Sequence, residues 1–457
     1  MRRRRGKKEF TTTRIIALGF LGAILIGTLL LMLPISAQSG KMTGIVDALF
    51  TSTTSVCVTG LVTVPTYAHW TIFGQFVIAL LAQVGGLGVI TFTMVFLLAL
   101  HRKIGMKERL LIQDAYNLDT IQGLVVLVKK IVKGTLVIEG IGALLYMTVF
   151  IPDFGVLRGI WYSIFNSISA FCNAGMDVIG PDSLMPYVGN PVVNLTTMFL
   201  IILGGLGFPV WWNVIDVLQQ RHKKRRGVRV SLQHLSLNSK LVLFMTFTLI
   251  FGGAFLIFVL EFNNPATLGS LSIGEKIQAA FFQSVTTRTA GFCTISQAGL
   301  GKATALICCI LMFIGGSPSG TAGGIKTTTM AILFLTVVSI IKGRRDTEMF
   351  GRKVGDIAVR RALSIFGVSF GVMILAVIIL AAVQPGNFLD CLFEVISAIA
   401  TVGLSRDFTT ELTIVGRIII IITMYIGRIG PISLALFFNS KRFVNVKSYP
   451  EERVSVG

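Results

Sequence analysis

The sequence predicts an all-α integral membrane protein built from four tandem repeats, each a helix, a re-entrant pore half-helix and a second helix. Three observations predict this fold: long apolar runs, basic clusters restricted to alternate loops, and four glycine turns at a nearly constant period. The 457 residues are 53% hydrophobic and only 14% charged, and their mean hydropathy is +0.79. A soluble domain carries about 25% charged residues, so the composition argues against a soluble enzyme.

Eight apolar runs are long enough to cross a bilayer, because about 20 residues of helix span its ~30 Å core. Seven of these runs are 15–34, 73–100, 134–151, 192–215, 240–260, 363–383 and 413–438. The eighth run, 302–341, would be about 60 Å long as one helix, twice the membrane thickness. Its middle, 315–324, contains glycines and a proline that disfavour helix, so we expect one span broken there.

The first run could be read as a signal peptide, because a basic segment precedes it. Its length and the lack of a small-residue cleavage pattern instead favour a retained first span.

The basic residues indicate the orientation of the chain in the membrane. The formal net charge is +20, and 32 of the 41 Lys and Arg residues fall at the two ends of the chain and in alternate loops, whereas seven fall in the opposite loops. By the positive-inside rule, we expect a multi-pass protein of the cell membrane with both termini cytoplasmic. The charge is then mostly topological, and we do not expect the protein to bind nucleic acid.

Cysteine usage and the polar residues indicate no enzyme chemistry. The six cysteines contain no C-x-x-C pair, so we expect neither a disulfide framework nor a zinc site. The sequence also lacks a nucleophile paired with a base and a glycine-rich nucleotide loop. We therefore expect no catalytic residues and no covalently bound cofactor.

A short apolar stretch follows the first span of each repeat. The four stretches are 44–55, 160–171, 274–286 and 388–400. Each is about 12 residues, or ~18 Å of helix, which is half a membrane. Each ends in a small-residue turn, and the glycines of these turns are Gly60, Gly175, Gly291 and Gly403, spaced by 115, 116 and 112 residues.

A second landmark recurs in each following span, at Gly85, Gly204, Gly315 and Gly427. Two landmarks at one period indicate internal repeats, and four such repeats can close around a central axis with pseudo-fourfold symmetry. We divide the chain into a basic N-terminal segment 1–13, repeats 14–115, 116–230, 231–350 and 351–440, and a C-terminal tail 441–457. The third repeat contains the broken second helix and the loop 315–324.

The four turns suit an alkali cation. Non-helical backbone inside a membrane has to be buried or to line water, and rings of backbone carbonyl oxygens can replace the hydration shell of a dehydrated ion. The C-terminal dipole ends of the half-helices favour a cation further. The alternative is that the glycines only allow close helix packing, which is less expected for four turns in register.

The turn sequences resemble the filter turns of the Trk/Ktr/HKT superfamily of potassium transporters, and the eight spans resemble most the membrane subunit of bacterial Ktr systems. The resemblance covers nearly the whole chain. It implies that K⁺ binds at four turns: Cys57, Val58, Thr59 and Gly60; Cys172, Asn173, Ala174 and Gly175; Arg288, Thr289, Ala290 and Gly291; and Ala400, Thr401, Val402 and Gly403. Cys57 and Cys172 depart from the usual threonine and asparagine of the family.

Two basic residues lie inside spans, where charge is costly and normally faces a wet cavity. Arg428 replaces the second glycine of its landmark, so we expect its guanidinium in the cation path; the alternative is a salt bridge at the inner face. We expect Lys326 to anchor the broken loop at the cytoplasmic rim or to snorkel. The resemblance implies a gate formed by Arg428, Lys326 and the loop Gly315, Gly316, Ser317, Pro318, Ser319, Gly320, Thr321, Ala322, Gly323 and Gly324.

Glu139 is expected near the cytoplasmic end of the third span, solvated or paired with Lys133. A proton or sodium role for this residue is the alternative.

These features predict potassium uptake driven by the membrane potential. A broken-helix symporter that binds a solute at the midplane and a membrane-embedded lipid transferase are the alternatives. The resemblance further implies a homodimer in membrane lipid, a cytosolic ring of nucleotide-binding regulatory subunits, and a dependence on Na⁺. The cytoplasmic segments 101–133, 217–240, 342–361 and the tail are the expected contact surfaces.

Overall fold

The computed structural model describes residues 12–99, 105–106, 109–110, 113, 123–224, 233–430, 450 and 452. Most of these residues are helical, and the strands among them form one short antiparallel hairpin, β1 (Glu348–Met349) with β2 (Arg352–Lys353). Most of the basic N-terminal segment, much of the predicted contact segments 101–133 and 217–240, the end of the last predicted span and nearly all of the tail lie outside the described residues.

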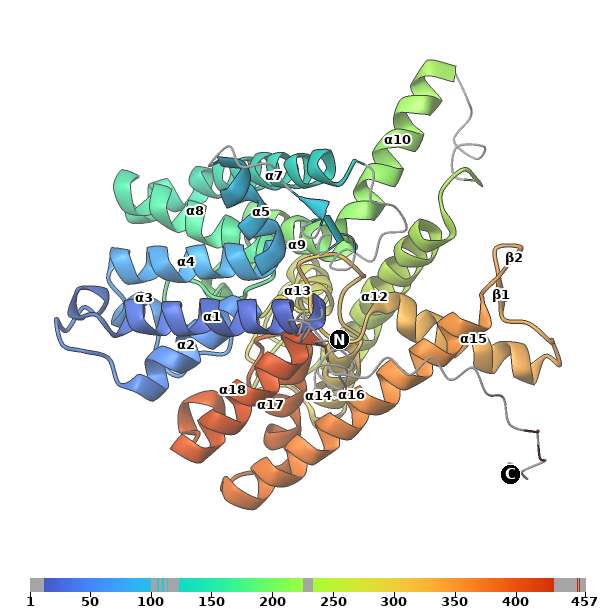
Figure 1. The fold of residues 1–457 in the computed structure, drawn as a ribbon. Coiled ribbons are helices and arrows are strands. Elements are labelled where there is room, and N and C mark those ends of the chain that lie inside the picture. Colours follow the sequence, from blue (N-terminus) through green and yellow to red (C-terminus); the bar gives the residue numbers. More distant parts are fainter. Residues whose placement is uncertain are drawn as a thin grey trace, which may run out of the picture.

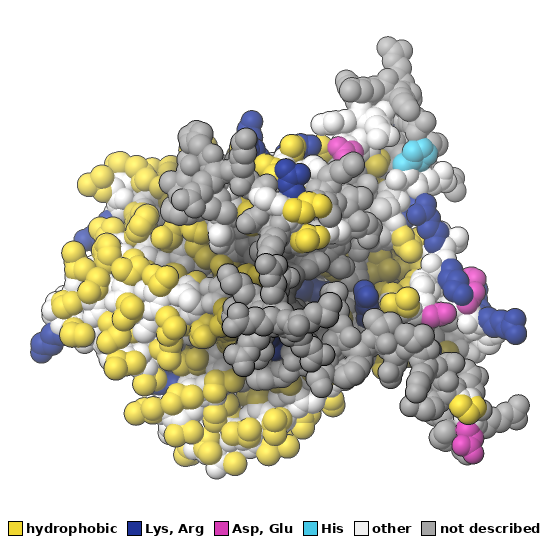
Figure 2. Space-filling model, viewed as in Figure 1, with side chains coloured by type: hydrophobic (Ala, Val, Ile, Leu, Met, Phe, Trp, Pro, Cys, Tyr) yellow, Lys and Arg dark blue, Asp and Glu magenta, His cyan; other side chains and the backbone are white. Residues whose placement is uncertain are grey.

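Four long helices match the predicted first span of each repeat. They are α1 (Thr12–Met32), α7 (Leu124–Phe154), α12 (Leu237–Glu261) and α16 (Asp356–Val383). All four are long and apolar enough to cross a membrane. Their outer faces carry exposed apolar side chains such as Leu29 and Leu144. Figure 2 shows such side chains over the helices on the left and lower sides, while charged side chains gather around β1 and β2.

Four short helices lie at the predicted half-helices. They are α2 (Ile45–Cys57), α8 (Val156–Cys172), α13 (Ile273–Thr286) and α17 (Phe388–Ala400). The C-terminal halves of these helices are buried. Polar caps fix two of their starts, because Ser272 and Glu275 form a capping box on α13, and Asn387 caps α17. The outer connections add α3 (Thr66–His69), η1 (Pro34–Ser36), η2 (Met185–Tyr187) and η3 (Thr409–Glu411).

The second helices differ from the prediction, which expected only the third to be broken. The segments are α4 (Ile72–Leu87) and α5 (Val89–Ala99), α9 (Pro191–Leu206) and α10 (Phe208–Lys224), α14 (Lys302–Phe313) and α15 (Thr327–Ile341), and α18 (Ile414–Ile429). Continuous spans over 73–100 and 192–215 are wrong, because Gly88 and Gly207 interrupt them at φ of 85° and 89°. The axes of α9 and α10 differ by 98°. Among the described residues, four helices are long and apolar enough to span a membrane without interruption, or five if this bent pair counts as one span. The last predicted span, 413–438, extends past the described residues.

The helix groups pack in a closed order. Helix α4 packs on α8, α9 on α13, α14 on α17, and α18 on α2. Figure 1 shows the groups following one another around a common centre, from blue α1, α2 and α4 through α7 and α8 to red α17 and α18. The last described helix, α18, thus returns to the N-terminal group, and the buried ends of the short helices meet in the middle.

Candidate functional site

The four glycine turns share one unusual backbone conformation. The residue two positions before each glycine is left-handed, with φ of 58° at Val58, 60° at Asn173, 69° at Thr289 and 53° at Thr401. The glycines themselves also have positive φ, between 65° and 101°. Left-handed backbone is uncommon for residues other than glycine and persists only where the surroundings enforce it. Four instances at equivalent positions indicate one shared turn geometry.

The turns form a closed ring. Each glycine faces a carbonyl oxygen of the next turn: Gly60 faces Ala174, Gly175 faces Ala290, Gly291 faces Val402, and Gly403 faces Thr59. A Cβ atom built on Gly60 would lie only 2.6 Å from the Ala174 oxygen, and one built on Gly403 would overlap the Thr59 oxygen. Side chains are thus excluded at all four positions, and four carbonyl oxygens come together at the level of the glycines.

Hydrogen bonds within each turn hold its shape. The amide of Thr59 donates to the carbonyl of Thr54 at 2.8 Å, and the amide of Gly60 donates to the hydroxyl of the same residue at 2.9 Å. The fourth turn repeats both bonds, because Val402 and Gly403 donate to the carbonyl and the hydroxyl of Ser397 at 2.8 and 3.0 Å. These bonds engage the amides of the first and fourth turns, so that their carbonyl groups rather than their amides can face an ion.

The first residue of each predicted set lies at the base of its turn. Cys57, Cys172 and Ala400 are the last residues of their short helices, and Arg288 is buried just past the end of α13. The Sγ atom of Cys172 lies 3.3 Å from Oε1 of Gln83 on α4. This side chain therefore points toward α4, and the backbone is the better candidate for an ion ligand.

The second landmark glycines allow the second helices to touch the turns. A Cβ atom on Gly85, Gly204 or Gly427 would overlap the carbonyl oxygen of Val56, Phe171 or Ile399, respectively. Gly315 differs, because it packs against Gly323 within its own loop. In the third repeat, the loop between α14 and α15 thus takes the place of the second helix at this level.

This loop lies against the base of the ring and is held mostly by other repeats. The amides of Ser317 and Thr321 donate to the carbonyls of Gly205 and Gly204 at 2.9 and 3.1 Å. The hydroxyl of Thr321 donates to Oδ1 of Asn173 at 3.1 Å, directly below the second turn. On the opposite side, a Cβ on Gly324 would lie 3.3 Å from the carbonyl oxygen of Ala400, below the fourth turn.

The remaining predicted gate residues belong to the same loop. Ser319 accepts a hydrogen bond from the amide of Phe208 at 3.1 Å, and the Pro318 carbonyl closely approaches Gly207. Gly316 donates to Gly323 at 3.2 Å within the loop. Gly320 packs on the carbonyl of Gly204. The loop therefore fills the break between α9 and α10.

Arg428 and Lys326 fasten the loop from the cavity side. The Arg428 guanidinium donates to the carbonyl oxygens of Thr321 in the loop and of Gly85 on α4, and Lys326 donates to the Ala322 carbonyl at 2.7 Å. Both side chains line a cavity of about 410 Å³ next to the ring, and no Asp or Glu is among its described lining residues. Two basic side chains, one from α18 and one from the start of α15, thus bind the loop and line this cavity.

A second cavity of about 270 Å³ lies on the other side of the ring. It is lined by all four turn glycines together with Asp177, Asp407 and Cys293. Two carboxyl groups thus line this cavity, and a cleft lined by charges of one sign concentrates ions of the opposite sign. The ring therefore separates an acidic vestibule from a basic inner cavity.

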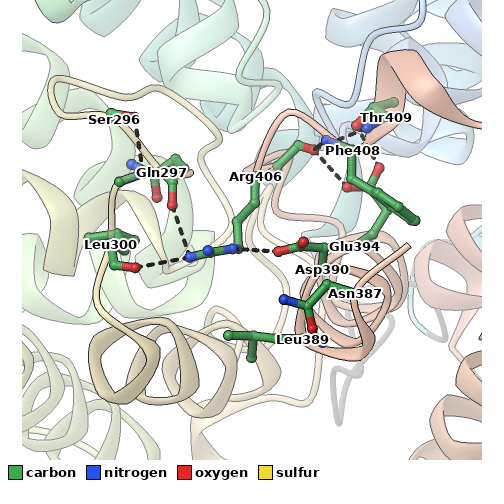
Figure 3. Close-up of polar contacts among 12 residues, drawn as sticks. Ser296, Gln297, Leu300, Asn387, Leu389, Asp390, Glu394, Arg406, Phe408 and Thr409 are labelled. Carbon is green, nitrogen blue, oxygen red and sulfur yellow. Dashed lines mark hydrogen bonds and ion pairs between the residues drawn. The ribbon is translucent and has the colours of Figure 1, made fainter. Parts of the chain in front are cut away.

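Two arginines tie neighbouring groups together around this vestibule. Figure 3 shows Arg406 between Asp390 on α17 and the loop after the third turn; its Nε lies 2.7 Å from Asp390 Oδ1, and its Nη1 donates to the carbonyls of Gln297 and Leu300 at 3.2 Å. Arg417 on α18 makes an ion pair of 2.7 Å with Asp47 on α2. Neither clamp was predicted from the sequence, and the paired residues of the second are 370 positions apart.

The environment of Glu139 also differs from the predicted one. It is 6% exposed within α7, and its carboxylate accepts from Gln83 at 3.3 Å and lies 3.8 Å from the Sγ of Cys172. The prediction of a solvated or Lys133-paired residue is wrong, because the helix packing turns this side chain inward. The signal available in the sequence was a polar residue at a repeat position that is otherwise apolar.

Comparisons with known proteins agree with this geometry. The family described as "Cation transport protein" (TrkH) matches residues 9–445. The chain belongs to this family. It is 40% identical to the "Ktr system potassium uptake protein B" of Bacillus subtilis (strain 168) over 98% of this chain and 97% of that protein. It is 38% identical to the "Potassium/sodium uptake protein NtpJ" of Enterococcus hirae over 100% and 99% of the two chains.

A solved structure has the same fold. The crystal structure of the potassium transporter TrkH from Vibrio parahaemolyticus matches with a TM-score of 0.73 and 17% identity, over 96% of this chain and 86% of that one. The protein is therefore a mostly helical membrane protein of a cation transporter family, and its homologues are ion transporters rather than enzymes.

Proposed function

We propose that this protein takes up K⁺ across the cell membrane through the ring of four turns. The observation that carries the proposal is the closed set of contacts in which each turn glycine faces a carbonyl of the next turn. Carbonyl rings of this kind replace the hydration shell of an alkali cation. The family and the potassium uptake relatives support the choice of ion.

In this mechanism the ring, the vestibule and the loop have separate tasks. The acidic vestibule gathers cations, and the ring strips their water. A membrane potential of 100 mV supplies about 2.3 kcal/mol per charge, which is enough to drive accumulation without ATP chemistry on this chain. The loop 315–324 with Arg428 and Lys326 is the gate, since it lies directly below the ring and brings positive charge into the path.

We further propose the repeat architecture and topology expected from the sequence. Four repeats within 14–440 surround the axis with pseudo-fourfold symmetry and eight membrane crossings, some of them in broken segments, and both termini face the cytoplasm. The cyclic packing of α4 on α8, α9 on α13, α14 on α17 and α18 on α2 supports this arrangement.

The proposed partners follow from the relatives. We propose a homodimer in the membrane, joined to a cytosolic nucleotide-binding regulatory ring, because relatives are named as proteins of a Ktr system. Stimulation by Na⁺ is proposed because another relative is named as a potassium/sodium uptake protein. We assign K⁺ as the transported ion and no covalent cofactor.

Uptake of radioactive rubidium by potassium-starved cells that lack other uptake systems tests the function. Cells with the wild-type protein should accumulate rubidium, and unlabelled K⁺ should compete. Gly291→Asp should abolish uptake at unchanged protein level, because a carboxylate side chain does not fit between the Val402 carbonyl and the neighbouring glycines. Persistent uptake by this variant would contradict the proposal.

The broken-helix symporter stays an alternative, because the breaks at Gly88 and Gly207 are additional interruptions that a midplane solute site could use. In that case a solute other than an alkali cation should be required for rubidium uptake.

A further inference from the structure

Behind the second turn, three polar side chains meet at the boundary between two helix groups. Glu139 on α7 accepts a hydrogen bond from Nε2 of Gln83 on α4 at 3.3 Å, and Cys172 at the end of α8 lies 3.3 Å from Oε1 of the same glutamine. The Cys172 Sγ also lies 3.8 Å from Oε1 of Glu139. The three groups, which we call the polar lock, close a triangle of contacts among themselves.

The polar lock breaks an apolar pattern. A serine of each of the first three short helices donates to the carbonyl of one residue on the long helix: Ser52 to Ile24, Ser167 to Glu139, and Ser284 to Ile250, at 2.6 to 2.8 Å. These bonds mark the three acceptors as equivalent positions, and two of them are isoleucine. Gln83 lies two residues before Gly85, and the same position in the other groups is held by Ile202, Phe313 and Tyr425.

An inward-facing carboxyl group at this depth needs a reason. An ionisable group inside a membrane is costly, and the equivalent positions of the first and third long helices carry isoleucine. The described contacts of the Glu139 carboxylate include no basic side chain. Its contact with Cys172 connects it to the base of the second turn.

Cys172 is the base of the second turn, and it has little freedom to move. A Cβ atom on Gly86 would lie 2.8 Å from the Cys172 Cβ and Sγ atoms, so α4 is pressed against this residue. The next two residues are Asn173, which is left-handed, and Ala174, whose carbonyl faces Gly60 in the ring. Holding Cys172 therefore holds one of the four ring oxygens.

We infer that the polar lock of Glu139, Gln83 and Cys172 sets the position of the second turn and thereby the preference of the ring for K⁺ over Na⁺. This inference rests on the proposed function. A ring that keeps its width favours the larger ion, K⁺. A ring in which one turn can move inward can also close around the smaller Na⁺. The lock acts by hydrogen bonding, so Glu139 is a positioning residue that does not touch the ion.

The test is a competition experiment on the full-length protein in proteoliposomes. Rubidium uptake is measured against increasing K⁺ or Na⁺. The inhibition constant of Na⁺ divided by that of K⁺ gives the preference for K⁺, and this ratio is compared among variants. Glu139→Leu should lower this ratio about fivefold, the effect expected from one lost hydrogen bond of about 1 kcal/mol. Glu139→Gln should keep the ratio, because its amide oxygen can still accept from Nε2 of Gln83 while its NH2 group donates toward the Sγ of Cys172.

Two more variants complete the test. Gln83→Leu should lower the ratio as Glu139→Leu does, and the double variant should lower it no further; if Glu139→Leu does not reach the membrane, Gln83→Leu carries the test. Ile24→Leu at the equivalent position is the matched control and should leave the ratio unchanged.

An unchanged ratio in the leucine variants, or an equal loss in Glu139→Gln, would overturn the inference while uptake itself remained. Absence of rubidium uptake by the wild-type protein would instead contradict the proposed function.

Discussion

The ring of turns and the loop below it have similar compositions but are held in place by different hydrogen bonds. Both are stretches of glycine and small residues at membrane depth. The turns are held mainly by hydrogen bonds to their own short helices, as between Thr59 and Thr54, whereas the loop is held mainly by residues of other helix groups, such as Gly204, Gly205 and Arg428. A self-supported turn keeps its shape, but a loop held from outside can leave as a unit. The difference suggests a rigid ion site above a movable gate.

The largest effect is expected in the ring. Gly403→Ala should lower rubidium uptake at least about a hundredfold, or about 2.7 kcal/mol, because the new Cβ overlaps the Thr59 carbonyl and φ is 95°. Uptake assays at matched protein level provide the measurement. Gly252→Ala on α12 is the control, because nothing lies within 4 Å of its Cβ; equal losses in both variants would remove the distinction between ring and scaffold.

The next effect is expected at the loop, with the opposite sign. Arg428→Ala removes two hydrogen bonds from a charged donor, each worth about 1.5 to 3 kcal/mol, and also removes a positive charge from the path. We expect the initial rate of uptake to rise about tenfold. Arg428→Lys should give a smaller rise, because one ammonium group does not bridge Thr321 and Gly85 in the same way. An unchanged rate in Arg428→Ala would assign this arginine to packing alone.

A partial effect is expected in the vestibule. All six cysteines are free and Cys293 is the one that is not fully buried, and it lines the cavity above the ring. A membrane-impermeant thiol reagent added outside should slow uptake several-fold, and K⁺ should protect. Cys293→Ser should be insensitive. Block from the inside only would reverse the proposed orientation of the ring and the loop.

The smallest effect on uptake is expected at the Arg406 clamp. Arg406→Ala should lower the melting temperature of the purified protein by a few degrees, since about 1.5 to 3 kcal/mol is lost with its charged hydrogen bonds. Uptake per folded molecule should change less than about twofold. Arg344→Ala is the matched control, because its ion pair with Glu348 is about half exposed; a collapse of uptake in Arg406→Ala would mean that the clamp belongs to the ion site.

The features that recur in all four repeats could be predicted from the sequence, whereas most features that occur in one or two repeats could not. The half-helices, the glycine turns and the interruption at 315–324 follow from local composition and spacing, and the structure has helices and turns at those positions. The breaks at Gly88 and Gly207 were missed, because one glycine inside an apolar run does not reveal its φ. The direction of Glu139 and the pairing of Arg417 with Asp47 depend on packing between distant helices, which no local pattern records.

Diffraction from crystals soaked in thallium, an anomalous scatterer that mimics K⁺, tests the central claim most directly. We expect anomalous density on the axis of the ring, within coordination distance of the carbonyl oxygens of Thr59, Ala174, Ala290 and Val402, and its loss on competition with K⁺. Density that is absent from the ring but present at another site in the protein would contradict the claim that four turns share one ion.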